Sequence, residues 1–147
     1  MGTRKLTFKA EAQWVKVFPD NRDMFGYEDA YREFDGCYTI QVKLDEDQMA
    51  ELKASGSMLQ GKDDPDSSCR LITFKRKHKD RFDWASGAPK VTNQFGGDWD
   101  FGHDGPVGNG STVEVVVTVY DTSRPRIKGT RLEEVKVLDL VPVPEVA

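Results

Sequence analysis

Cysteine is scarce in this chain of 147 residues, which contains only Cys37 and Cys69. The two lie far apart in sequence, form no CxxC pair and have no histidine at metal-ligand spacing. Neither a disulfide framework nor a zinc site is therefore predicted, and two free thiols are typical of a reducing compartment. We expect an intracellular protein.

Histidine is equally rare, which limits the catalytic chemistry available. His78 lies in a run of cations and His103 in a glycine-rich loop, and no serine or cysteine stands in a recognisable nucleophile motif. Asp98, Asp100 and Asp104 alternate as in a calcium loop, but the closing glutamate is missing. We expect no enzymatic activity, no metal and no cofactor.

Long apolar runs and a net positive charge are lacking as well. No stretch approaches the length of a membrane span, and the first residues show no secretory signal, so we expect a non-secreted protein without membrane contact. A length of 147 residues fits a single domain over residues 1–147. The formal net charge of −4 argues against a generic basic nucleic-acid-binding protein.

The charge that is present is unevenly distributed. Residues 70–90 hold seven lysines and arginines against two aspartates, whereas residues 20–66 hold thirteen carboxylates against five cations. Residues 69–84, CRLITFKRKHKDRFDW, join a strand-like pattern to a cluster of cations and aromatic rings. Cations for phosphates and flat rings for bases are the two components of single-strand binding, although a solvated hairpin tip has the same composition.

Alternation of apolar and polar residues predicts an all-β fold. Strands are expected over residues 6–18, 37–44, 69–76, 112–121 and 130–141, with a brief edge strand at 90–92. After Trp14 the apolar residues change from even to odd positions, which indicates a β-bulge. Asp45 and Gln48 predict a capped short helix that ends before Gly56. We expect a five-stranded β-barrel of the OB-fold type with one short helix, and a two-sheet sandwich is the alternative.

Aromatic residues fall into two groups by position. Trp14, Phe74 and Tyr120 lie within strand patterns, where core positions are more common than base platforms. The others lie in polar, glycine-bearing segments, where the pattern does not require burial and the rings are available to stack on bases. These are Phe82, Trp84, Phe95, Trp99 and Phe101.

The C-terminal third carries a more specific pattern. A Gly-Asn-Gly-Ser turn at residues 108–111 leads into VEVVVTVY, followed by GTRL at 129–132 and VKVLDLV at 135–141. This part of the chain resembles the single-stranded DNA-binding proteins of tailed phages, especially short-tailed ones. The GAPKV segment at 87–91 and the early strand FKAEAQWVKVF are similar in position to that family.

The resemblance implies an OB-fold that coats and protects single-stranded DNA in phage replication and recombination, in the host cytoplasm. It also implies a homodimer in some relatives, and an acidic C-terminal tail that competes with DNA and recruits phage replication proteins. The sequence departs from the family at this point, because it ends VPVPEVA without an acidic run.

We therefore predict a non-enzymatic, sequence-independent single-stranded DNA-binding protein. The alternative is a protein-interaction or structural β-barrel of a phage complex. Phe82 and Trp84 are predicted to stack on bases. The residues predicted to contact phosphates are Lys9, Lys16, Lys75, Arg76, Lys77, Lys79, Arg81 and Lys90.

Overall fold

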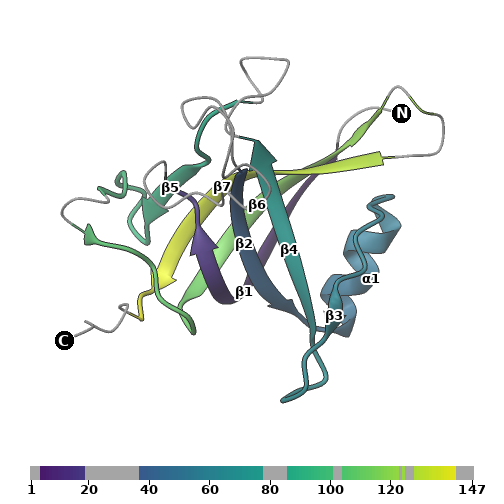
Figure 1. Ribbon diagram of the computed structural model, residues 1–147, viewed down its shortest axis with the longest axis horizontal. Coiled ribbons are helices and arrows are strands. Elements are labelled where there is room, and N and C mark those ends of the chain that lie inside the picture. Colours follow the sequence, from purple (N-terminus) through teal and green to yellow (C-terminus); the bar gives the residue numbers. More distant parts are fainter. Residues whose placement is uncertain are drawn as a thin grey trace, which may run out of the picture.

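The computed structural model describes residues 4–18, 37–77, 86–100, 104–122, 124 and 128–141. These residues form one seven-stranded sheet with the strand order β3-β4-β2-β1-β6-β7-β5, accompanied by a helix (Figure 1). The elements are β1 (Arg4–Lys16), β2 (Cys37–Leu44), α1 (Glu46–Ala54), β3 (Lys62–Asp63), β4 (Arg70–Lys77), β5 (Lys90–Asn93), β6 (Thr112–Asp121) and β7 (Lys128–Asp139).

The mostly β class with one short helix is confirmed, but the expected number of five strands is wrong. The described part of the chain contains seven strands, of which β3 has two residues and β5 has four. β3 lies where no strand was expected, and its Lys62 and Asp63 pair with Leu71 and Arg70 at the start of β4. Two polar residues show no alternation, so the sequence carried no signal for this strand.

β1 is the strand on which the sheet is built. Residues 4–11 pair antiparallel with β6, and residues 12–16 pair antiparallel with β2. Between Gln13 and Lys16 the register shifts, so that β1 has one residue more than β2 over the same length. The predicted β-bulge is thereby confirmed, and β1 bends sharply there (Figure 1).

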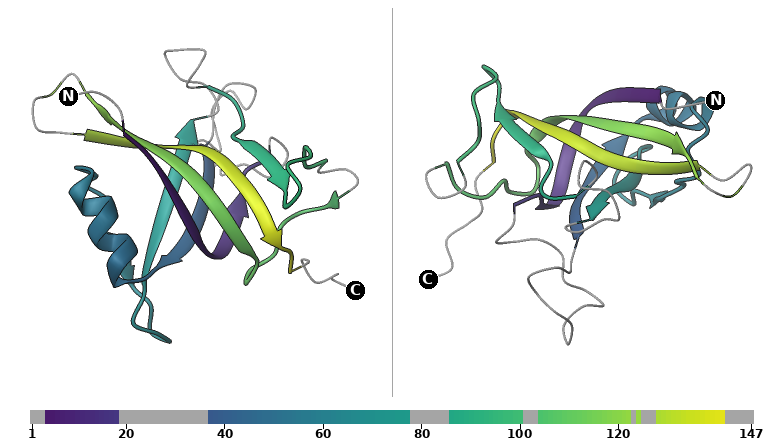
Figure 2. Two further views of the ribbon diagram at one scale, coloured as in Figure 1. Left: turned by 180° about the vertical axis from the view of Figure 1, so that it is seen from behind. Right: turned by 90° about the horizontal axis from the view of Figure 1, so that it is seen from above.

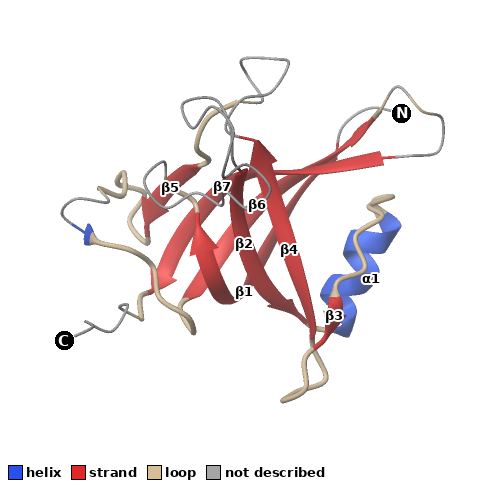
Figure 3. Cartoon of the chain, in the orientation of Figure 1, coloured by secondary structure: helices blue, strands red, loops and turns tan. Residues whose placement is uncertain are grey.

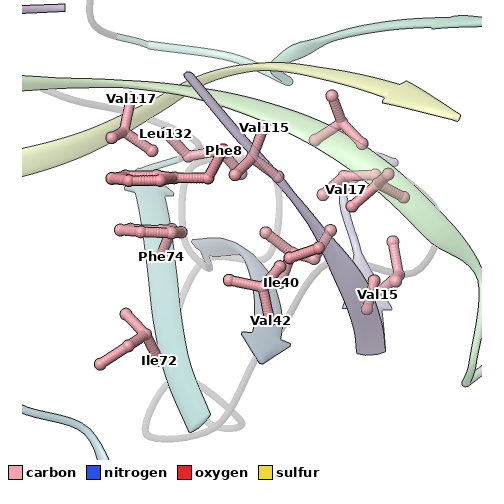
Figure 4. Close-up of a cluster of buried hydrophobic side chains, with 14 of the residues drawn as sticks. Phe8, Val15, Val17, Ile40, Val42, Ile72, Phe74, Val115, Val117 and Leu132 are labelled. Carbon is pink, nitrogen blue, oxygen red and sulfur yellow. The ribbon is translucent and has the colours of Figure 1, made fainter. Parts of the chain in front are cut away.

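The bend lets the two halves of the sheet enclose a common core (Figure 2). The rings of Phe8 on β1 and Phe74 on β4 lie parallel with their centroids 6.3 Å apart. Ile40, Val115 and Leu132 from three further strands are fully buried in the same cluster (Figure 4). Because the inner faces are filled in this way, the residues that alternate with them are left on the outer face.

The predicted helix cap is confirmed. The Asp45 side chain accepts a hydrogen bond from the Gln48 backbone N–H at 2.8 Å, and the Gln48 side chain accepts one from the Asp45 N–H at 3.0 Å. Gln48 also donates to the Lys9 carbonyl oxygen at 2.8 Å, which ties the start of α1 to β1. α1 lies next to β3 and one end of β4 (Figure 3). No helix in the described part of the chain is long and apolar enough to cross a membrane.

Residues 93–97 form a hydrogen-bonded turn at the end of β5. The Asn93 side chain accepts hydrogen bonds from the backbone N–H groups of Phe95 and Gly97 at 2.9 and 3.0 Å. The Trp99 N–H donates to the Val91 carbonyl at 2.9 Å, and the indole N–H donates to Gly105 at 2.8 Å. Trp99 packs against the core, so it is a structural residue rather than a free stacking platform.

Candidate nucleic-acid interface

Trp14 occupies the bulge of β1 and faces away from the core, with 62% of its surface exposed. The expectation that it belongs to the core is therefore wrong. Even-numbered residues of β1 point inward as far as Ala12, and odd-numbered residues do so from Val15 onward. Trp14 stands at the point where the phase changes, so alternation alone did not determine which way it faces.

The backbone of Trp14 adopts an unusual conformation, with a φ of +50°. This left-handed region costs about 1–2 kcal/mol for an L-residue with a side chain, and a bulky residue rarely occupies it. Strained backbone of this kind clusters at functional sites, where the surrounding structure holds it in place. The strain at Trp14 accompanies an exposed aromatic ring, which singles out this position.

A hollow of about 360 Å³ lies beside Trp14 on the outer face of β1, β2 and β4. Two lysines and three uncharged polar residues complete its lining, and no carboxylate is among the described residues that form it. The lining consists of Trp14, Lys16, Thr39, Gln41, Thr73 and Lys75.

Strand register arranges these side chains in rows. Lys16 on β1 is opposite Thr39 on β2, which is opposite Lys75 on β4, so the three form one row across three strands. Neighbouring strands are about 4.8 Å apart, which places the backbones of the two lysines about 10 Å apart. Gln41 and Thr73 form the next row, and together with Thr39 they make an uncharged floor between the cations.

A second hollow of about 410 Å³ continues from the first along β4. The two share Gln41 and Thr73, and the second extends past Leu71 to Lys62 on β3. A third hollow of about 590 Å³ adjoins it at Leu59 and runs along α1. The three hollows therefore follow one another through shared lining residues, from Trp14 to α1.

Carboxylates gather around Lys43, which is paired with Leu71 of the second hollow. Lys43 on β2 lies 3.4 Å from the Asp64 carboxylate and 3.8 Å from that of Glu11. Burial opposes the charge of Lys43, but the hydrogen bond to Asp64 and the nearby carboxylates outweigh burial and raise its pKa. The Ser67 hydroxyl and the Asp66 N–H hydrogen-bond to Asp64 and lower its pKa. Lys43 stays protonated, but its charge is already paired with these carboxylates, so it is unsuited to binding a phosphate.

The predicted phosphate contacts separate in the structure. Lys16 and Lys75 line the Trp14 hollow, and Lys77 is exposed on the same face of β4 two residues farther along. Lys9 is exposed opposite Glu114 in the part of β1 that pairs with β6, and Lys90 is exposed at the start of β5. The remaining predicted contacts, Lys79, Arg81, Phe82 and Trp84, lie outside the described residues.

The prediction that Arg76 contacts phosphate is wrong, because its side chain faces inward and only 8% of the residue is exposed. Its guanidinium donates to the carbonyl oxygens of Gly87 at 2.9 Å and Ser86 at 3.1 Å, and it lies 3.4 Å from the Glu133 carboxylate. Arg76 lies on the same side of β4 as the buried Ile72 and Phe74. In a strand this alternation decides which way a side chain points, even for a cation within a basic run.

Sequence reasoning missed Trp14 and the uncharged floor residues of the hollow. The odd-numbered positions of β2 and β4 were the available signal for the floor, because they alternate with the apolar set. Phe95 was among the rings considered for stacking, and it is 88% exposed at the tip of the turn that follows β5. Among the described residues, no group of three or more His, Cys, Asp or Glu side chains is arranged to hold a metal.

The chain therefore combines a curved, mostly β sheet with an outer face that presents a tryptophan beside two lysines. Solved structures of two bacteriophage single-stranded DNA-binding proteins share this fold. The chain is similar to gp2.5, a single-stranded DNA binding protein encoded by bacteriophage T7, with a TM-score of 0.59 at 15% identity over 95% of this chain and 94% of that chain.

The second similar protein is the single-stranded DNA-binding protein from bacteriophage Enc34. Its C-terminal truncation matches with a TM-score of 0.61 at 16% identity, over 94% of this chain and 86% of that chain. The same protein in complex with ssDNA matches with a TM-score of 0.59 at 15% identity, with the same coverage. No protein-family model matches the chain, and no curated protein sequence is significantly similar to it. The resemblance seen in the sequence is therefore confirmed in the fold.

Proposed function

We propose that this protein is a sequence-independent single-stranded DNA-binding protein that coats and protects DNA in phage replication and recombination. The observation that carries the proposal is the exposed Trp14 beside Lys16 and Lys75, in a hollow whose described lining has no carboxylate. A ring that stacks on a base contributes about 1–3 kcal/mol, and lysines beside it neutralise phosphates. The similar Enc34 protein, solved in complex with ssDNA, supports this function.

The composition of the hollow favours tolerance of base sequence. Every base presents a flat face to an indole ring, so stacking on Trp14 does not select one base. The Gln41 amide both donates and accepts hydrogen bonds, and the threonine hydroxyls do the same, so each base edge finds a partner. Binding on this face involves no catalysis, and we place it in the host cytoplasm, where phage DNA is copied.

The proposal includes a finer description of the fold as an OB-type barrel. The five longer strands, β1, β2, β4, β6 and β7, would form the barrel, with β3 and β5 added at the ends of the sheet. Arg76 supports closure, because its guanidinium on β4 reaches the Leu132 carbonyl on β7 at 3.5 Å. A closed barrel keeps the outer face of β1, β2 and β4 rigid beneath a bound strand.

A titration of fluorescently labelled oligo-dT, followed by anisotropy, tests the function. We expect affinity for the single strand to exceed affinity for a duplex, and the Lys16→Glu/Lys75→Glu double variant to lose most of it. The matched control is Lys5→Glu/Arg124→Glu, which reverses two exposed cations outside the hollow. Equal affinity for single strand and duplex would contradict the function, and a loss in the control variant alone would contradict the site.

The alternative function is that of a protein-interaction or structural barrel of a phage complex. The hollow along α1 is the observation that favours it, because exposed Met58 and Leu59 lie there beside Lys53 and Glu46. A protein that fails to bind oligo-dT at low salt while remaining folded would favour this alternative.

A further inference from the structure

The turn at residues 108–111 contacts β1 at the bulge that presents Trp14. Gly110 donates its backbone N–H to the Ala12 carbonyl at 2.8 Å, and Ala12 donates to the Ser111 carbonyl at 2.8 Å. The Asn109 side-chain oxygen accepts a hydrogen bond from the Trp14 backbone N–H at 2.7 Å. These contacts connect the turn to the proposed DNA-binding face.

The hydrogen bond from Trp14 to Asn109 falls where strand pairing is interrupted. On one side of the bulge Gln13 pairs with Gln41 on β2, and on the other side Lys16 pairs with Thr39. The Trp14 N–H lies between these pairs, so the Asn109 side chain takes the place of a strand partner. Without it, the N–H of a residue with a left-handed backbone would have to find another acceptor.

The turn itself is held rigidly. The Ser111 hydroxyl, which is buried, donates to the Gly108 carbonyl at 2.8 Å and accepts from the Val141 N–H at 2.8 Å. Gly108 in turn donates its N–H to the Val141 carbonyl at 2.8 Å. Asn109 is therefore fixed by contacts on the far side of the turn, which makes it a defined anchor for Trp14.

We propose that Asn109 is a positioning residue for single-strand binding. Its side-chain oxygen holds the Trp14 backbone in the left-handed conformation and so turns the indole ring toward the hollow. This inference rests on the proposed function, because it concerns how the stacking ring is presented. Asn109 acts through Trp14 and needs no contact with DNA of its own.

A double-mutant cycle with labelled oligo-dT tests the inference. We expect Asn109→Ala to weaken binding about fivefold, as the loss of one hydrogen bond allows, and Trp14→Ala to weaken it about tenfold or more. The double variant should bind no more weakly than Trp14→Ala alone, because the side chain that Asn109 positions is already absent. Additive losses, or wild-type affinity in Asn109→Ala, would overturn the inference.

The matched control is Asn93→Ala. Asn93 also accepts hydrogen bonds from backbone N–H groups through its side chain, but it does so in the turn after β5 and outside the hollow. The same substitution there should leave the affinity unchanged. A fivefold loss in the control would mean that loosening any turn impairs binding, and the special role of Asn109 would be refuted.

Hydrogen exchange of the Trp14 amide, measured by NMR in the free protein, provides a readout independent of DNA. Asn109→Ala should make this amide exchange faster, whereas Asn109→Asp, which keeps an acceptor oxygen, should preserve its protection. Loss of protection in Asn109→Asp, or full protection in Asn109→Ala, would overturn the inference even if one variant folded poorly. If Trp14→Ala binds like wild type the proposed function's site fails, whereas if only Asn109→Ala does so this inference alone fails.

Discussion

At the residue scale, the candidate site depends on the backbone of Trp14 as much as on its ring. A φ of +50° is unfavourable for tryptophan and acceptable for glycine, which has no Cβ. The ring is exposed, so its removal leaves no cavity in the core and the effect of the backbone can be measured separately from packing.

Substituting Trp14 should therefore reverse the usual order of alanine and glycine. In a regular strand glycine is the less stable of the two, but here we expect Trp14→Gly to be more stable than Trp14→Ala by about 0.5–1 kcal/mol. Urea unfolding followed by far-UV circular dichroism measures the difference. A more stable alanine variant would mean that Trp14 does not hold a left-handed backbone in solution.

Lys75 and Arg76 are neighbours in sequence with opposite roles, because they point to opposite faces of β4. Arg76→Met would remove the guanidinium that donates to the carbonyls of Ser86 and Gly87, and Glu133 would keep Arg131 as its only cation among the described residues. We expect it to lower the free energy of unfolding by about 2–4 kcal/mol. Lys75→Ala should change stability by less than about 0.5 kcal/mol and weaken DNA binding.

Urea unfolding and oligo-dT titration on both variants check this division. The expected outcome is that each variant fails in one assay and passes in the other. A stable Arg76→Met variant that no longer binds DNA would restore Arg76 to the binding site and contradict the placement of its side chain.

At the scale of elements, the sequence predicted what depends on local alternation and missed what depends on pairing. The bulge in β1, the capped helix α1 and the strands with apolar alternation follow from patterns within a few residues. β3 could not be predicted in this way, because two polar residues become a strand only when β4 supplies their partners.

The candidate site shows the same division between local and long-range information. Lys16 and Lys75 were predicted individually, but their shared row depends on the register through Thr39. The contact of Asn109 with Trp14 spans 95 positions, and no local pattern encodes it. Composition predicted a basic stretch at residues 70–90. The register of β1, β2 and β4 shows that Lys75 of this stretch shares a surface with Trp14.

The connection between β3 and β4 gives an element-scale prediction about pH. The pKa of Asp64 is lowered in the folded protein, chiefly by the Ser67 hydroxyl and then by the Asp66 N–H, so its charged form stabilises the fold. This contribution is present above the ordinary pKa of an aspartate and is lost as the pH falls below that pKa and through the lowered value.

Urea midpoints measured between neutral and acid pH should therefore decline less for Asp64→Asn than for wild type. Asp139→Asn, at the exposed end of β7, is the control and should follow the wild-type curve. An Asp64→Asn variant that loses stability in acid as steeply as wild type would show that the hydrogen bonds to this carboxylate do not stabilise the fold.

At the scale of the whole molecule, a chain with a net charge of −4 is proposed to bind a polyanion through a cationic face. The two are compatible because the charges are separated in space. Acidic residues occupy the first turn of α1 and the segment around Asp64, whereas lysines flank Trp14 on the outer face of the sheet. Repulsion between these carboxylates and the phosphates would keep a bound DNA strand near Trp14.

This separation predicts how salt affects binding. Each single-strand phosphate neutralised by a lysine contributes about −0.7 to the slope of log affinity against log salt concentration. Lys16→Gln and Lys75→Gln should each reduce the magnitude of the slope by about 0.7, whereas Lys5→Gln should leave it unchanged. Trp14→Ala should lower affinity at every salt concentration without changing the slope, because a stacked base releases no counterions.

Anisotropy titrations at four or more salt concentrations distinguish the roles of the ring and the lysines. If Trp14→Ala changed the slope as much as Lys75→Gln did, the ring would be required for phosphate contact, and the division between a stacking ring and flanking cations would be incorrect. If neither lysine variant changed the slope, the phosphates would lie on another face of the molecule. A constant slope in Trp14→Ala, together with shallower slopes in both lysine variants, would place the strand across the row formed by Lys16, Thr39 and Lys75.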